Sequence, residues 1–278
     1  MSNAGVIGLG TIGGGVAVCL ARSGQLGAVY DVRPNASDTL DGVPAVSATP
    51  ADLARQVDVV LIAVVNAPQV IAVLEGADGV LSQARPSLTV VLLSTVSIED
   101  LTGIRRLTDA AGVGLVDCGV TGGTKAAENG LVCLVGASDE ALALVKPVLD
   151  GFARSVAHMG GPGAGMAAKI ARNVVVFGCL RAGYEGALLA RRSGVDVAKL
   201  SRVIEESADT VGGPMMLMGR PADPLTDPEE AKLREYVRSL MVKDLDAALD
   251  LARSFGVSLP VIEIAKRSDR IMTGLELE

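Results

Sequence analysis

The sequence predicts an α/β domain built on a doubly wound, mostly parallel sheet, followed by an all-α domain. Strand-sized apolar runs alternate with helical patterns over about the first 160 residues, an order typical of parallel sheets. The first of these runs passes through a glycine-rich turn into a helical pattern. After Gly165 the strand signals end and only helical patterns follow. We therefore expect one domain over residues 1–160 and a second over residues 161–278.

Seven short apolar runs are expected to form the strands, over residues 4–9, 27–31, 57–65, 88–93, 113–117, 131–135 and 155–158. Helical patterns cover residues 16–23, 69–74, 98–111, 166–193, 197–208, 229–254 and 259–272. Ser97, three residues before Asp100, has the spacing of a side chain that caps the helix after it. Residues 210–228, rich in Gly, Pro, Met and Asp, are predicted to be an irregular loop lined by Met215, Met216 and Met218.

The composition favours a soluble, cytoplasmic protein. Hydrophobic residues make up 49% of the 278 residues and the mean hydropathy is +0.43, yet no apolar run reaches the length of a membrane span. No basic and apolar signal segment precedes the first expected strand. The net charge is −7 and no basic run is present, so nucleic acid is not expected as a partner.

The few cysteines and the single histidine argue against a metal site. Cys19, Cys118, Cys133 and Cys179 are scattered without metal-like spacing and in apolar surroundings, so they are interpreted as reduced core residues. His158 is the one histidine of the chain, which excludes a histidine-rich metal site. Its position in a short strand-like run favours a structural role.

The turn from Gly8 to Gly13 has the G-x-G-x-x-G pattern of a dinucleotide-binding turn, with Leu9, Thr11 and Ile12 between its glycines. Gly8 permits the tight turn, Gly10 lets a pyrophosphate approach the backbone, and Gly13 lets helix and strand pack closely. The pattern predicts a Rossmann-type domain that binds NAD or NADP.

The end of the second expected strand bears on which of the two coenzymes binds. Asp31 there would accept hydrogen bonds from the ribose hydroxyls and repel a 2′-phosphate, which favours NAD over NADP. Arg33 keeps NADP open, because a nearby arginine can accommodate the phosphate.

A second set of polar residues follows the glycine-rich turn at 160–165. Lys169, Arg172 and Asn173 are three and four residues apart, so they share one face of the expected helix. A solvated helix face would have the same pattern, but a lysine beside an amide also suits a general acid with a substrate-orienting group. Thr121, Gly122 and Gly123 offer a hydroxyl and open N–H groups that could hold a carboxylate.

Four separated motifs together resemble the β-hydroxyacid dehydrogenase family, which includes 3-hydroxyisobutyrate dehydrogenase and is related to 6-phosphogluconate dehydrogenase. The motifs span residues 8–13, 117–123, 163–173 and 243–245. Ile12 stands where the family usually has Met, Gly119 where it has Pro, Thr121 where it has Ser, and Arg172 where it has the first Asn of a pair. The resemblance covers essentially the whole chain.

The resemblance implies roles for particular residues. Lys169 would be the catalytic lysine and Asn173 a substrate-orienting amide, while Thr121, Gly122 and Gly123 would bind the substrate carboxylate. The residues implied to contact the coenzyme, beyond the glycine turn, are Val64, Val65, Thr95 and Lys243. Lys243 would close over the cleft near the nicotinamide. The helical domain would support a homodimer or homotetramer.

The resulting hypothesis is an oxidoreductase that transfers a hydride between a nicotinamide coenzyme and a small β-hydroxy acid, or the matching aldehyde or ketone acid. Arg172 either faces the cleft and favours a substrate with a second anionic group, or turns outward and pairs with an acid. Two alternatives are an imine reductase-like enzyme and a non-catalytic NAD(P)-binding regulatory module.

Overall fold

The computed structural model of the chain describes residues 3–211 and 225–276. The chain divides into two compact units, residues 1–172 and residues 173–278. The predicted loop methionines Met215, Met216 and Met218 lie outside the described residues. In the described part of the chain, every helix is too short or too polar to cross a membrane.

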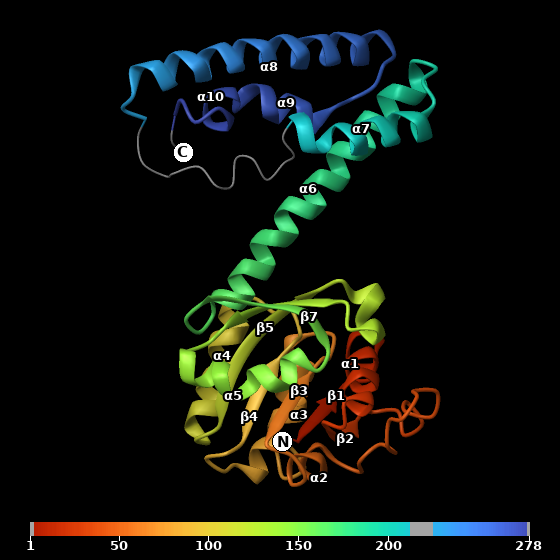
Figure 1. Cartoon of the computed structure of the whole chain (residues 1–278), viewed down its shortest axis with the longest axis vertical. Helices are drawn as coiled ribbons and strands as arrows, with labels where there is room; N and C mark the ends of the chain where they lie inside the picture. The colour runs from red at the N-terminus through yellow and green to blue at the C-terminus, as the bar shows by residue number, and fades with distance from the viewer. Residues whose placement is uncertain (1–2, 212–224, 277–278) are drawn as a thin grey trace. The chain divides into compact units, whose positions relative to one another are not determined.

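The first unit contains one seven-stranded sheet, which confirms the predicted fold class (Figure 1). The strand order is β2-β1-β3-β4-β5-β6-β7, and every neighbouring pair is parallel except β5 with β6. The strands are β1 (Ala4–Ile7), β2 (Leu26–Tyr30), β3 (Val59–Ile62), β4 (Thr89–Leu92), β5 (Gly114–Thr121), β6 (Leu131–Gly136) and β7 (Ala153–Gly160).

Helices cover both faces of this sheet, as a doubly wound fold requires. They are α1 (Thr11–Arg22), α2 (Pro50–Ala54), α3 (Ala67–Leu74), α4 (Ile98–Ala110) and α5 (Asp139–Asp150), with the short 3-10 helices η1 (Val80–Gln83) and η2 (Gly123–Glu128). One hydrophobic cluster joins α1 and α5 to Leu61 and the strand residues that share its face. A second joins α2, α3 and α4 to Val60 and Ile62, on the opposite face. Because both faces are buried, the central strands β1, β3 and β4 are apolar apart from Thr89.

Apart from strand ends, the first unit differs from the sequence prediction in the length of β5 and in two additional helices. Residues 118–121 were expected in a loop, but they extend β5, because they pair with β6 from Cys118 opposite Val135 to Thr121 opposite Val132. Helices α2 and α5 were not predicted. The predicted cap at Ser97 is confirmed, since its Oγ accepts a hydrogen bond from the Asp100 N–H at 3.0 Å.

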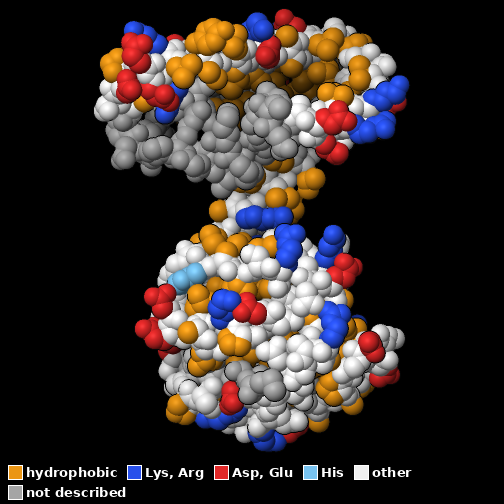
Figure 2. Space-filling view, in the orientation of Figure 1, with side chains coloured by type: hydrophobic (Ala, Val, Ile, Leu, Met, Phe, Trp, Pro, Cys, Tyr) orange, Lys and Arg blue, Asp and Glu red, His pale blue; other side chains and the backbone are white. Residues whose placement is uncertain are grey.

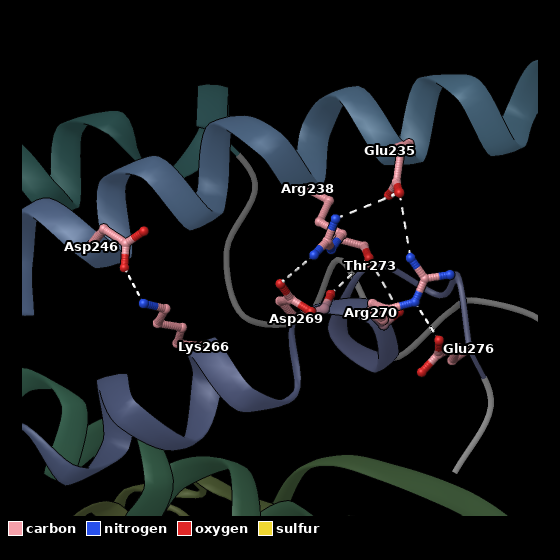
Figure 3. Close-up of polar contacts among 8 residues, drawn as sticks. All are labelled: Glu235, Arg238, Asp246, Lys266, Asp269, Arg270, Thr273 and Glu276. Carbon is pink, nitrogen blue, oxygen red and sulfur yellow. Dashed lines mark hydrogen bonds and ion pairs between the residues drawn. The ribbon is translucent and has the colours of Figure 1, made fainter.

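The helices α6 (Ala164–Arg192), α7 (Val197–Val211), α8 (Pro228–Ser254), α9 (Pro260–Arg267) and α10 (Asp269–Met272) follow the sheet. The predicted helix over 259–272 is interrupted at Ser268, which separates α9 from α10. Ion pairs connect these short helices to α8 (Figure 3). Arg238 on α8 contacts Asp269 at 3.0 Å, and Lys266 on α9 pairs with Asp246.

The cysteine interpretation is correct for three of the four residues. Cys19, Cys118 and Cys133 are buried, but Cys179 is exposed on α6. The hydrogen bond from Cys133, together with burial, raises the pKa of the Cys118 thiol. A neutral, buried thiol is a core residue rather than a nucleophile.

Candidate functional site

The predicted dinucleotide turn lies between β1 and α1. Gly8 has φ +89°, and a side chain there would come within 2.7 Å of the Ala63 carbonyl oxygen. A Cβ on Gly13 would overlap the Gly8 carbonyl oxygen, so both glycines are required by the backbone. A Cβ on Gly10 would meet no atom within 4 Å. The turn therefore packs tightly on one side and is open at Gly10, as an approaching pyrophosphate requires.

The remaining residues of the turn complete this arrangement. Thr11 is the exposed first residue of α1, and Leu9 and Ile12 pack into the hydrophobic core. Gly10, at the N-cap position, makes no side-chain cap for α1. The first N–H groups of this helix suit a phosphate, because a helix N-terminus carries partial positive charge.

Asp31 lies directly after β2 and is held in place by the turn and by Arg33. Its Oδ2 accepts the Leu9 N–H at 2.7 Å, and its Oδ1 accepts the Arg33 Nε–H at 2.9 Å. The hydrogen bond from the Arg33 side chain lowers the pKa of Asp31 to about 2. Asp31 is therefore a fixed negative charge at the rim of the turn.

A pocket of about 330 Å³ opens between the turn and Asp31. Val64 and Val65 of the predicted set line it, and Val65 is largely exposed. Its lining also includes residues that sequence reasoning missed, which are Ile7, Tyr30, Val32, Ala63, Gln69, Ala72 and Val73. Gln69 fixes the rim, because its Oε1 accepts the Val65 N–H at 3.0 Å. The pocket has the apolar walls and polar edge expected of an adenosine site. Thr95, exposed after β4, is not part of its lining.

The predicted carboxylate cradle is brought beside the dinucleotide turn. Gly122 has φ +89°, and a side chain on Gly123 would come within 2.8 Å of the Ile12 Cδ1 atom. A second hollow, of about 300 Å³, is lined by both Gly10 and Gly123. Thr121 is half-buried at the end of β5. The dinucleotide turn and the predicted carboxylate cradle, which are far apart in the chain, thus lie side by side.

Lys169 is buried on the first part of α6, with 9% of its surface exposed. Its stem lies over Gly119 of β5, since a Cβ at that glycine would overlap the Lys169 Cβ atom. Burial, and then the nearby charge of Arg172, lower the pKa of Lys169. A desolvated amine with a lowered pKa is suited to proton transfer near neutral pH.

The other predicted polar residues are more accessible. Arg172 is exposed and Asn173 is half-buried, one on each side of the boundary between the two units. Lys243 lies on α8 in the second unit, 70% of its side chain is exposed, and it pairs with Asp244 at 3.2 Å. It also lines a hollow on α8 together with Arg238, Ser239, Val242 and Asp246.

His158 has the structural contacts that its position suggested. Its Nε2 lies 2.9 Å from the Ala137 carbonyl oxygen, and its Nδ1 lies 3.6 Å from Asp139. Ala137 lies in the turn between β6 and α5, and Asp139 is the first residue of α5, so the histidine connects β7 to the start of this helix.

Two family models match the chain over nearly its full length. The NAD binding domain of 6-phosphogluconate dehydrogenase matches residues 3–161. The NAD-binding domain of NADP-dependent 3-hydroxyisobutyrate dehydrogenase matches residues 163–273.

Several proteins of known sequence are similar to this chain. It is 32% identical to a 3-hydroxyisobutyrate dehydrogenase of Pseudomonas aeruginosa, over 96% of this chain and 90% of that protein. It is 31% identical to an L-threonate dehydrogenase of Escherichia coli, over 94% and 86%. An uncharacterized oxidoreductase of Mycobacterium tuberculosis is 33% identical over 98% and 92%.

Solved structures show the same fold. A crystal structure of a Mycobacterium avium protein has a TM-score of 0.86 at 30% identity and covers 99% of both chains. The 3-hydroxyisobutyrate dehydrogenase of Mycobacterium tuberculosis, determined with L-serine, has a TM-score of 0.67 at 27% identity over 98% and 93%. An imine reductase of Pseudomonas sp. has a TM-score of 0.76 over 97% and 93%, and its 18% identity supports likeness of fold alone.

Proposed function

The chain belongs to the β-hydroxyacid dehydrogenase family, and on this premise we propose that it transfers a hydride between a nicotinamide coenzyme and a small β-hydroxy acid. The matching aldehyde or ketone acid is the substrate of the reverse reaction. The observation that carries the proposal is the buried Lys169 on the first turns of α6, in a unit that also contains a dinucleotide turn and, beside it, the glycine pair Gly122-Gly123.

Lys169 is proposed to be the general acid and base. When bound, a nicotinamide coenzyme supplies the hydride acceptor at its C4 atom. In oxidation, the neutral Lys169 amine takes the proton of the substrate hydroxyl. The carbon that bears this hydroxyl gives its hydride to the nicotinamide and becomes a carbonyl carbon. In reduction the lysine returns this proton. An ordinary lysine, with a pKa of about 10.4, is mostly protonated at neutral pH. Burial of Lys169 therefore increases the fraction of the amine that can accept a proton.

The substrate is proposed to bind through its carboxylate to Thr121, Gly122 and Gly123. The Thr121 hydroxyl and the backbone N–H groups are donors that a carboxylate can accept. We further propose that Asn173 orients the substrate hydroxyl and that Lys243 closes over the nicotinamide end of the coenzyme, where Thr95 contributes a contact. In this scheme residues 1–160 bind the coenzyme and residues 161–278 supply the helices that carry the lysines and the amide.

NAD is the proposed coenzyme, with Asp31 as the residue that selects it. A carboxylate with a pKa of about 2 stays charged at any working pH, so it accepts ribose hydroxyls and repels a 2′-phosphate. Arg33 is engaged by both oxygens of Asp31, which makes it less able to bind a phosphate. Turnover measured separately with NAD and NADP tests this preference. A higher kcat/KM with NADP would contradict it.

Arg172 is proposed to select a substrate with a second anionic or strongly polar group. It lies three residues after Lys169 on α6, close enough for its charge to lower the pKa of that lysine. The test is a panel of β-hydroxy acids with one and with two acidic groups, assayed on the wild type and on Arg172→Ala. The selectivity for diacids is expected to fall in the variant. An unchanged selectivity would place Arg172 outside the substrate pocket.

The decisive experiment for the reaction is Lys169→Ala. Removing a general acid and base typically lowers turnover by about 10²–10⁴-fold, and we expect that loss in kcat with the Kd for NADH within about twofold of the wild type. Lys146→Ala, which removes an exposed lysine paired with Asp150, is the matched control and is expected to retain full activity. Undiminished turnover in Lys169→Ala would overturn the assignment.

The panel of β-hydroxy acids, used beside a panel of cyclic imines, separates the two alternative functions. An imine reductase-like enzyme would reduce cyclic imines and leave hydroxy acids untouched. A non-catalytic module would bind NADH tightly and turn over no member of either panel.

We also propose that the protein is cytoplasmic and forms homodimers or homotetramers through its helical domain. Within the second unit, α6 exposes large apolar side chains at intervals of three and four residues, which are Val174, Phe177, Leu180 and Tyr184. Such a stripe on a helix typically contacts another protein surface. Figure 2 shows hydrophobic side chains over a broad area of the helical unit. Leu180→Glu should lower the mass measured by light scattering, whereas Leu144→Glu, an exposed leucine of α5, should not.

A further inference from the structure

The first turn of α6 is capped by a residue of the sheet. The residue before this helix is Gly163, which has no side chain with which to cap it. Instead the carboxylate of Asp117, in β5, accepts two N–H groups of the turn. Its Oδ1 accepts from Gly163 at 2.6 Å and its Oδ2 accepts from Met166 at 2.8 Å. Asp117 therefore replaces the side-chain cap that most helices carry in their own sequence.

The capped turn lies directly on the backbone of the sheet. A side chain on Gly165 would overlap the Leu134 carbonyl oxygen, and one on Gly136 would come within 2.5 Å of the Asp117 Oδ2 atom. Asp117 itself has no exposed surface. A buried carboxylate requires hydrogen bonds or a countercharge. Besides the two N–H groups, it has the Arg105 guanidinium of α4 at 3.5 Å.

The same contact region determines where Lys169 lies. Lys169 follows Met166 by three residues, so it is less than one turn away from the capped N–H group. Its Cβ and Cγ atoms lie against Gly119, two residues after Asp117 in the same strand, and a Cβ at Gly119 would come within 2.9 Å of the Cγ atom. One strand thus holds the start of α6 through a carboxylate and receives the lysine stem at a glycine.

We propose that Asp117 is a positioning residue, whose carboxylate closes the first turn of α6 and thereby holds Lys169 across Gly119. The kinetic part of this inference rests on the proposed role of Lys169. Asp117 touches no substrate in this scheme. Asp117 acts through the helix, and the stem of Lys169 packs against Gly119.

The test uses Asp117→Asn, which keeps the size of the side chain but replaces one acceptor by a donor that opposes a helix N–H group. We expect faster amide hydrogen exchange in peptides covering residues 160–172, and a kcat about 10²-fold lower, since small displacements of a catalytic group cost this much. The Kd for NADH should stay within twofold. Ser138→Ala, which removes the cap of α5 in the same unit, is the control and should leave kcat unchanged.

A second readout does not depend on activity. The pH midpoint at which Lys169 is acetylated by trace acetic anhydride, with Lys146 as the internal reference, reports how strongly the amine is desolvated. This midpoint should move to higher pH in Asp117→Asn, because a displaced Lys169 is less desolvated and its pKa is lowered less. The acid limb of the kcat/KM profile for oxidation should move in the same direction. An unchanged midpoint with an unchanged kcat overturns the proposal. Full turnover in Lys169→Ala overturns the proposed function instead, and the acetylation midpoint and the hydrogen exchange still decide the role of Asp117.

Gly119→Ala changes the strand surface against which Lys169 packs. It serves as the test if Asp117→Asn does not fold. The added methyl group should displace Lys169 and lower kcat with the Asp117 carboxylate still in place, because it would overlap the Lys169 Cβ atom and come within 3.2 Å of the Gly165 carbonyl oxygen. Gly114→Ala is the matched control at the other end of β5, where a Cβ would come no nearer than 3.2 Å to its neighbour Thr89. Equal kcat values in the two glycine variants would contradict the proposed packing of Lys169.

Discussion

The sheet unit (residues 1–172) and the helical unit (residues 173–278) are stabilised in different ways. The sheet unit contains two hydrophobic clusters, one on each face, whose members are nearly all fully buried. The described residues of the helical unit contribute only a few buried apolar side chains, which are Ala190, Ala252 and Leu259. Its helices instead expose large hydrophobic residues and are joined by ion pairs (Figures 2 and 3). Buried apolar contacts therefore hold the sheet unit together, while polar contacts have a larger share in the described part of the helical unit.

The largest expected effect on the free energy of unfolding comes from a Leu→Ala substitution, compared between the two units. Leu61→Ala, at a fully buried position of β3, should lower the free energy of unfolding by about 2–5 kcal/mol, because it removes apolar contacts and leaves a cavity. Leu251→Ala, on α8 with 41% of the residue exposed, should cost within about 0.5 kcal/mol. Urea unfolding followed by circular dichroism measures both. Equal losses would remove the distinction between the units.

A smaller effect on the free energy of unfolding is expected at a buried carboxylate that links two helices of the helical unit. Glu185 on α6 is buried, and its two oxygens each accept the Val261 N–H at 3.1 Å at the start of α9, where Leu259 provides no side-chain cap. Glu185→Ala leaves this N–H group without its acceptor and should cost about 1–3 kcal/mol.

Asp250→Ala is the control for Glu185→Ala. It removes an exposed pair with Arg253 on α8 and should cost no more than about 0.5 kcal/mol. Urea unfolding again gives both values, with hydrogen exchange of α9 peptides to locate the change. A Glu185→Ala variant as stable as Asp250→Ala would show that the helical unit does not depend on this carboxylate.

The two units also differ in how far the sequence predicts them. The strands of the sheet and the start of α4 follow from apolar runs and from Ser97, because both signals are local. The extension of β5 through Cys118 and Gly119 could not be predicted, since it depends on pairing with β6. No local signal marks the break at Ser268, after which Asp269 pairs with Arg238 of α8.

The candidate site follows the same division between local and tertiary signals. The dinucleotide turn and Asp31 are local patterns, so the sequence predicts them directly. The burial of Lys169 and the capping of α6 by Asp117 are tertiary, since the partners lie more than 40 residues apart. No local pattern marks Asp117 as a helix cap. The pocket wall at Gln69 and Val73 was missed for a similar reason, because it is formed by one face of α3.

The smallest expected effect concerns the ion pair between Asp31 and Arg33, which lies at the pocket of the sheet unit rather than in its core. The hydrogen bond from Arg33 lowers the folded-state pKa of Asp31 to about 2, below the value of about 3.9 for an unfolded chain. The charged carboxylate therefore stabilises the fold above about pH 4, and this contribution is lost as the pH falls towards 2. Because Arg33 is 60% exposed, water and salt reduce the contribution to about 1 kcal/mol.

Asp31→Asn tests this contribution in the coenzyme-free protein. The difference in unfolding free energy between wild type and variant should be about 1 kcal/mol at pH 7 and should shrink between pH 4 and pH 2. Arg33→Ala should reproduce most of the loss at pH 7 and add little to Asp31→Asn in the double variant, because both changes remove the same interaction. Urea unfolding at pH 7, 4 and 2.5 gives these values. A difference that stays constant over this range would mean that Asp31 contributes through the shape of the turn and the Leu9 N–H bond rather than through its charge.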